Sequence, residues 1–136
     1  MIELVMAAVR DRLALGTLDR LQWVGIGLAA VTGLIHLGLG LGAPTTPIGA
    51  ASILAGLGYG VAIALFLIGY RRRLVAALGI PYVASQIVLW YLVNQPGSLA
   101  DVSTAAMIDK PVQVVLIAIC VVIVQRSDAE RGTHES

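Results

Sequence analysis

Charged residues are scarce in this sequence. Only 12% of its 136 residues are Asp, Glu, Lys or Arg, about half the share that a soluble domain carries. Hydrophobic residues make up 58% of the chain, and the mean hydropathy is +0.89. This composition predicts an integral membrane protein with a single domain.

Other features that are missing exclude further classes of protein. The net charge of +1 offers no basic surface for nucleic acid. A single cysteine, Cys120, cannot form a disulfide within the chain. The alternating pattern of a membrane β-strand is also missing, which leaves helices as the way to satisfy backbone hydrogen bonds in lipid.

Four apolar segments are long enough to cross the membrane, which takes about 20 residues of helix. They are residues 22–42, 48–70, 74–94 and 106–124. The fourth is the weakest, but Pro111 is tolerated in a first helical turn and Asp109 would cap the helix just ahead of it. Short connections make neighbouring spans antiparallel. The sequence therefore predicts an all-α membrane protein, an antiparallel bundle of four transmembrane helices.

Basic residues indicate the orientation of this bundle. Of the nine basic residues, eight lie on one side of the predicted membrane and Lys110 lies on the other. The eight are Arg10, Arg12, Arg20, Arg71, Arg72, Arg73, Arg126 and Arg131. Basic residues favour the cytoplasmic side, so we predict a multi-pass protein of the cell membrane with both termini inside.

Three segments outside the spans also have predicted structures. Residues 1–21 have apolar residues on both sides of their charges, which predicts a cytoplasmic helix or one that lies in the membrane interface. Residues 125–136 are expected to form a cytoplasmic tail. In the long third connection, a short interfacial helix is expected over about 99–107, where Ser98 and Asp101 have the spacing of a capping pair.

Small residues indicate where helices pack closely. Ser52, Gly56 and Gly60 follow one another at intervals of four residues in the second span. Gly33 and Gly40 stand seven apart in the first span. Close packing through small residues drives association of membrane helices, so we predict that these two stripes face each other.

Three polar side chains are predicted to share one level in the outer half of the membrane. At 1.5 Å per residue, His36 lies about 9 Å below the outer end of its span, Gln86 about 12 Å and Gln113 about 9 Å. A neutral imidazole and two amides can satisfy one another by hydrogen bonding. This structural role is our main interpretation of His36. A haem or metal ligand and a proton relay are the alternatives.

No catalytic constellation is found in the sequence, and no residues have the spacing of metal ligands. We therefore expect a protein without enzymatic activity, cofactor or metal site. Its expected partners are the lipid bilayer and either further copies of itself or an unidentified membrane protein. The leading interpretation is an accessory subunit or a small homo-oligomer. The alternatives are a transporter or channel component, and a haem-binding redox subunit that uses His36.

Several strings together resemble a known family. They are "LQWVGIGLAAVTGLIHL", "LAGLGYGVAIAL", "YRRRLVAALGIPY", "QIVLWYLVNQP" and "DKPVQVVLI". They are similar to sequences of small four-helix membrane proteins found mainly in halophilic archaea, a family of unknown function. The resemblance covers about residues 19–126. It implies four spans and an archaeal source, and it supplies no activity, cofactor or catalytic residue.

Overall fold

The computed structural model describes residues 1–135, with side chains described for all of them except 8–12 and 133–135. The described chain is helical and has no strand. Its elements are α1 (Ile2–Arg12), η1 (Leu15–Thr17), α2 (Arg20–Leu41), α3 (Pro47–Leu67), α4 (Arg72–Asn94), η2 (Leu99–Asp101) and α5 (Thr104–Glu135). Four helices, α2 to α5, are long and apolar enough to cross a membrane. The predicted all-α four-helix bundle is confirmed.

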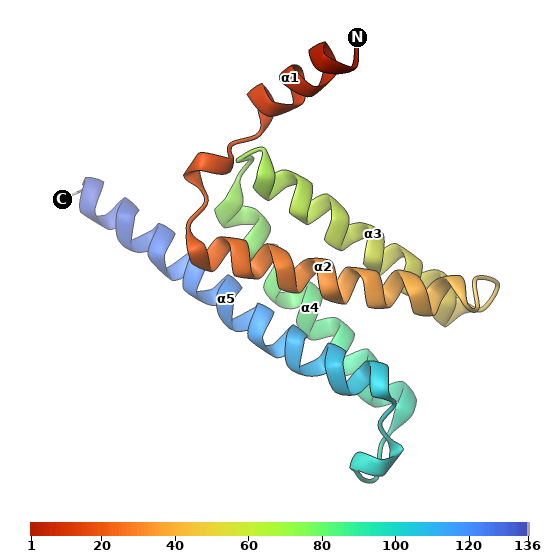
Figure 1. Cartoon of the computed structure of the whole chain (residues 1–136). Helices are drawn as coiled ribbons and strands as arrows, with labels where there is room; N and C mark the ends of the chain where they lie inside the picture. Colours follow the sequence, from red (N-terminus) through yellow and green to blue (C-terminus); the bar gives the residue numbers. More distant parts are fainter. Residues whose placement is uncertain (136) are drawn as a thin grey trace.

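The four long helices form two antiparallel hairpins. Figure 1 shows that the α2–α3 hairpin crosses the α4–α5 hairpin and that their connecting loops point away from each other. Helix α2 packs on both α3 and α5, and α4 packs on α5, whereas α3 and α4 contact each other least. Helix α1 projects from the bundle, and residues 1–7 are exposed. Arg10 and Arg12, which contribute to the predicted charge bias, lie where side chains are not described.

The ends of the first two spans follow from local capping. The Asp19 carboxylate accepts from the backbone N–H of Gln22 at 2.8 Å, and the Gln22 side chain accepts from the Asp19 N–H at 3.2 Å. Thr46 caps α3 in the same way, and Pro47 occupies the first helical position. Helix α3 ends at Leu67, earlier than predicted, because Gly69 adopts a left-handed φ of 74°.

The start of α5 differs from the prediction. The Ser103 hydroxyl accepts from the N–H of Ala106 at 3.2 Å, so the helix begins at Thr104. The prediction that Asp109 caps this helix is wrong, since Asp109 and Pro111 both lie inside it. The short helix expected over 99–107 is reduced to η2, while Ser98 and Asp101 do form the predicted capping box. At its other end, α5 continues through the predicted tail to Glu135.

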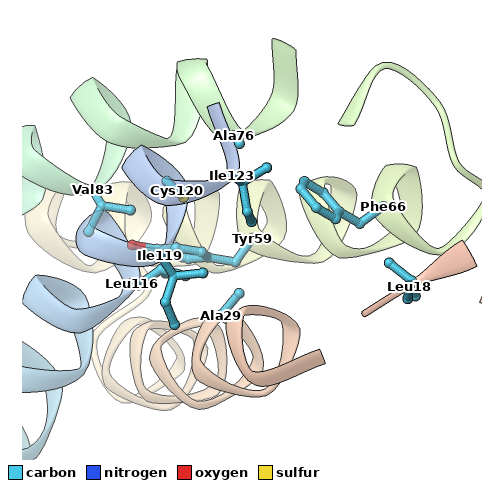
Figure 2. Close-up of a cluster of buried hydrophobic side chains, with 10 residues drawn as sticks. All are labelled: Leu18, Ala29, Tyr59, Phe66, Ala76, Val83, Leu116, Ile119, Cys120 and Ile123. Carbon is cyan, nitrogen blue, oxygen red and sulfur yellow. The ribbon is translucent and has the colours of Figure 1, made fainter. Parts of the chain in front are cut away.

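The apolar core fills the half of the bundle where α2 begins and α5 ends. Figure 2 shows its buried side chains converging from all four long helices and from the segment before α2. They are Leu18, Ala29, Tyr59, Phe66, Ala76, Val83, Leu116, Ile119, Cys120 and Ile123. Cys120 is thus a core residue, and its thiol is free.

Glycines bring α2 and α3 into backbone contact. A Cβ added to Gly56 would lie 2.6 Å from Leu37 Cγ and 2.9 Å from the Gly33 carbonyl oxygen. A Cβ on Gly40 would lie 2.6 Å from the Gly49 carbonyl oxygen. The contact of Gly33 with Gly56 agrees with the prediction that the two stripes face each other, whereas Gly40 packs on Gly49 and Ile53.

The observed close contact on α3 extends toward the start of the helix and does not reach Gly60. Gly60 is exposed and has no heavy atom within 4 Å of an added Cβ, while Ser52 is half-buried. Gly49 is buried instead, and an added Cβ would overlap the Ala43 carbonyl oxygen. Gly49 lies about 20° and Gly60 about 40° around the helix from Gly56, so rotation alone does not separate them. Figure 1 shows α3 diverging from α2 away from their connecting loop.

Candidate functional site

A cluster of hydrogen-bonded polar side chains joins all four long helices inside the bundle. We call it the polar cluster. Its members are Thr32 from α2, Tyr59 from α3, Gln86 from α4, and Asp109, Lys110 and Gln113 from α5. Asp109, Thr32 and Gln113 are the buried polar residues of the described chain. Because polar groups in hydrocarbon are costly, this cluster is the candidate functional site.

Gln113 lies at the centre of the polar cluster and is 0% exposed. Its amide Nε2 donates to Gln86 Oε1 at 2.9 Å and to the Tyr59 hydroxyl at 3.3 Å. Its Oε1 accepts from Lys110 Nζ at 2.9 Å. The Tyr59 hydroxyl in turn donates to Gln86 Oε1 at 2.7 Å. The predicted neighbours Gln86 and Gln113 are therefore brought together, with Tyr59 as a third partner.

Asp109 and Lys110 form an ion pair inside the bundle. Lys110 Nζ lies 3.0 Å from Asp109 Oδ2, and the Thr32 hydroxyl donates to Asp109 Oδ1 at 2.5 Å. The Lys110 ammonium also lies 5.5 Å from the centre of the Trp90 ring. Each charge thus has an opposite charge and a further polar or aromatic partner, which offsets the cost of removing it from water.

His36 lies beside the polar cluster and bonds within its own helix. Its Nδ1 is 2.8 Å from the Thr32 carbonyl oxygen and 3.4 Å from the Thr32 hydroxyl. Its ring centre is 5.9 Å from that of Tyr59. No hydrogen bond joins it to Gln86 or Gln113 among the described residues, so the predicted three-residue layer is wrong in this respect. Residues four apart share a helix face, and this places Thr32 within reach of the imidazole.

The hydrogen bond to the Thr32 carbonyl makes Nδ1 the protonated ring nitrogen of His36 and leaves Nε2 as the atom that would bind a metal. Among the side chains that the structure describes, no three from His, Cys, Asp or Glu gather closely enough to hold a metal ion. Haem ligation by His36 stays a prediction.

Sequence reasoning missed four members of this cluster: Thr32, Tyr59, Asp109 and Lys110. Asp109 and Lys110 were placed near the outer surface because Pro111 was taken as the start of the helix. One signal was available in the spacing, since Asp109 and Gln113 stand four residues apart and share a face once α5 is extended to Thr104.

One polar atom of the cluster has no partner. Gln86 Nε2 is buried without a hydrogen bond, while Gln86 Oε1 accepts two. An unpaired buried donor costs about 1–3 kcal/mol. Every other fully buried polar side-chain atom of the cluster therefore has a hydrogen-bond partner.

No family model, curated protein or solved structure matches this chain. The resemblance to small membrane proteins of halophilic archaea therefore stays a prediction.

Proposed function

We propose that this multi-pass membrane protein is non-enzymatic and serves as an accessory subunit or a small homo-oligomer. The observation that supports the proposal is that the side chains of the polar cluster bond to one another. Tyr59, Asp109 and Lys110 direct their polar atoms at one another and at Gln86, Gln113 and Thr32. Groups engaged in this way hold helices together and are not presented to a substrate.

The surface of α3 supports association with another membrane helix. Gly60 and Ala64 lie one turn apart on the exposed side of α3, and nothing occupies the space next to Gly60. Small residues at this spacing let a second helix approach closely in lipid.

The oligomeric state and the copurifying proteins test this proposal. We expect the tagged protein, extracted in mild detergent, to show a detergent-corrected mass that is a multiple of 14.2 kDa, or to retain a stoichiometric membrane partner. Gly60→Leu should weaken that association, while Gly27→Leu, at an equally open glycine on α2, should not. A monomer without any partner would contradict the proposal.

We also propose that both termini and Arg71–Arg73 face the cytoplasm, which the bias of the basic residues supports. Thr45 lies exposed in the α2–α3 connection at the opposite end of the bundle. A cysteine placed there, on a background without Cys120, should react with a membrane-impermeant maleimide in intact cells. Labelling that requires permeabilisation would reverse the orientation.

A transporter or channel component is a second candidate, and Asp109 favours it. Asp109 is buried inside α5 and paired with Lys110. Intramembrane ion pairs commonly mark ion or proton pathways. In proteoliposomes, an Asp109→Asn variant that folds but loses a proton or cation flux of the wild type would support this candidate. Absence of flux in the wild type would reject it.

A further inference from the structure

Two cavities meet at the end of the bundle where α2 begins and α5 ends. The first is apolar, has a volume of about 70 Å³ and is lined by all four long helices. The second is polar, has a volume of about 230 Å³ and lies between the starts of α2 and α4 and the last turns of α5. Gln22 and Ile123 line both, so the two cavities lie next to each other.

The apolar cavity lies within the core of the bundle. Figure 2 shows Phe66, Ala76, Cys120 and Ile123 around this region, and all four line the cavity. Its lining includes Phe66 of α3 and Gly79 and Tyr82 of α4, so both helices of the α3–α4 seam contribute to it. The Tyr82 hydroxyl on α4 donates to the Ala55 carbonyl oxygen on α3 at 2.7 Å and so connects the two helices across this seam.

Arg72 gives the polar cavity a fixed positive charge. Its guanidinium donates to the Phe66 carbonyl at 2.9 Å, to the Thr17 hydroxyl at 2.6 Å and to the Ala14 carbonyl at 3.0 Å. These partners hold the side chain in place, but they are neutral oxygens. Among the described residues, no carboxylate forms an ion pair with Arg72.

Arg126 adds a second cation that is only loosely paired. Its closest carboxylate oxygen, on Asp19, lies 3.9 Å away, and the arginine side chain is 61% exposed. The third arginine of the cavity, Arg73, is engaged with Asp128 at 2.7 Å. Asp19 and Glu130 also line the cavity, so its walls carry three guanidinium groups and two carboxylates.

We propose that the two adjacent cavities bind one membrane phospholipid, with its phosphate between Arg72 and Arg126 and one hydrocarbon chain in the apolar cavity. Guanidinium groups bind phosphate through paired hydrogen bonds, and basic pockets between membrane helices suit lipid headgroups. A volume of 70 Å³ is about half that of a cavity that holds benzene, so only a short part of the chain enters. The rest of the lipid's hydrocarbon chain follows the α3–α4 seam into the bilayer.

The two halves of this site separate a phospholipid from simpler ligands. A free anion would leave the apolar cavity empty, and a neutral lipid would leave the charge of Arg72 without a counter-ion. The probes are therefore dioleoyl phosphatidylglycerol, dioleoylglycerol with the same chains, and inorganic phosphate. The measurement is the thermal unfolding of the whole chain in detergent, at increasing probe concentration. We expect saturable stabilisation by phosphatidylglycerol alone.

Matched variants locate the binding. Arg126→Gln should weaken the apparent affinity for phosphatidylglycerol about tenfold, as expected for one charge-assisted hydrogen bond, while Arg131→Gln on the same helix should not. Arg72 is left unchanged because its backbone contacts support the fold. Ala62→Leu, which fills the apolar cavity, should also weaken binding, while Ala51→Leu at an exposed position of α3 outside the cavity should not.

Several results would overturn the proposal. Equal stabilisation by dioleoylglycerol would show that the phosphate is not recognised. Equal stabilisation by inorganic phosphate would show a site for free anions. Equal losses in Arg126→Gln and Arg131→Gln would show attraction by the whole charged surface, and unchanged binding in both Arg126→Gln and Ala62→Leu would place the lipid elsewhere.

Discussion

The contacts that α2 makes with α3 and with α5 differ in kind. Toward α3, Gly33 and Gly40 let the two backbones approach closely. Toward α5, the Thr32 hydroxyl bonds to the buried Asp109 carboxylate at 2.5 Å. The first interface depends on the absence of side-chain atoms, and the second depends on polar atoms that have few alternative partners in lipid.

This difference shows that one helix uses two independent means of association. Lipid tails are as apolar as leucine side chains, so burial of apolar surface alone does not join helices in the membrane. The α2–α3 interface should therefore respond to side-chain size, and the α2–α5 interface to charge and hydrogen bonding. The following substitutions separate these two responses.

The largest effect is expected at the polar interface. Asp109→Leu should lower the free energy of unfolding by about 3 kcal/mol, because it leaves the Lys110 ammonium and the Thr32 hydroxyl without their partner. Asp109→Asn should cost less, since its amide oxygen still accepts from Thr32. Unfolding in mixed detergent and SDS micelles measures both. A stable Asp109→Leu variant would show that the pair contributes nothing to the bundle.

Next in size is the effect at the glycine interface. Gly56→Leu should cost about 2–3 kcal/mol, because the added atoms would overlap Leu37 and the Gly33 carbonyl. The matched control is Gly60→Leu one turn along α3, where the side chain points into open space and the cost to the monomer should stay below about 0.5 kcal/mol. Equal losses in the two variants would mean that α3 is rotated from its observed position.

The α3–α4 seam offers a weaker third contact. Tyr82→Phe removes the hydroxyl that donates to the Ala55 carbonyl, and we expect a loss of about 1 kcal/mol. Gly58→Ala tests the same contact from α3, because an added Cβ would overlap the Tyr82 hydroxyl. If neither substitution changes the unfolding transition in detergent, the contact of Tyr82 with α3 does not stabilise the bundle.

The smallest effect is expected at His36. The observed partner of His36 is the Thr32 carbonyl, which stays within helix α2 when His36 is replaced. The Thr32 hydroxyl keeps its bond to Asp109. His36→Gln and His36→Leu should each cost less than about 1 kcal/mol. A larger loss for His36→Leu alone would reveal a partner across the bundle. A Soret band of the wild type that both substitutions remove would identify haem and reject the structural role.

Much of the fold could be predicted because it depends on local properties. The spans are set by the length of uncharged runs, and Gly33, Gly40 and Gly56 occupy the close contact that their spacing predicted. Gly60 lies only about 40° around α3 from Gly56, and its spacing could not show that the close contact ends before it. An isolated span does not show which of its faces meets a neighbour, so exposed and buried glycines look alike in sequence.

The candidate site was predictable only in part. Depth along the helix axis brought Gln86 and Gln113 to one level, and they do form a hydrogen bond at 2.9 Å. The depth of a residue along the helix axis does not show in which direction its side chain points. His36 bonds within α2. The role of Asp109 depended on where α5 begins, which the Ser103 cap decides rather than Pro111.

The sequence by itself determined the number of spans, their order and their apolar composition, because these follow from the cost of exposing a polar backbone to hydrocarbon. Tertiary structure alone decided which polar side chains meet. The crossing of the two hairpins brings Thr32 and Tyr59 to the face of α5 that carries Asp109 and Gln113, and Gln86 joins them from α4. Contacts between distant segments depend on helix rotation and crossing, which packing sets and which no single span encodes.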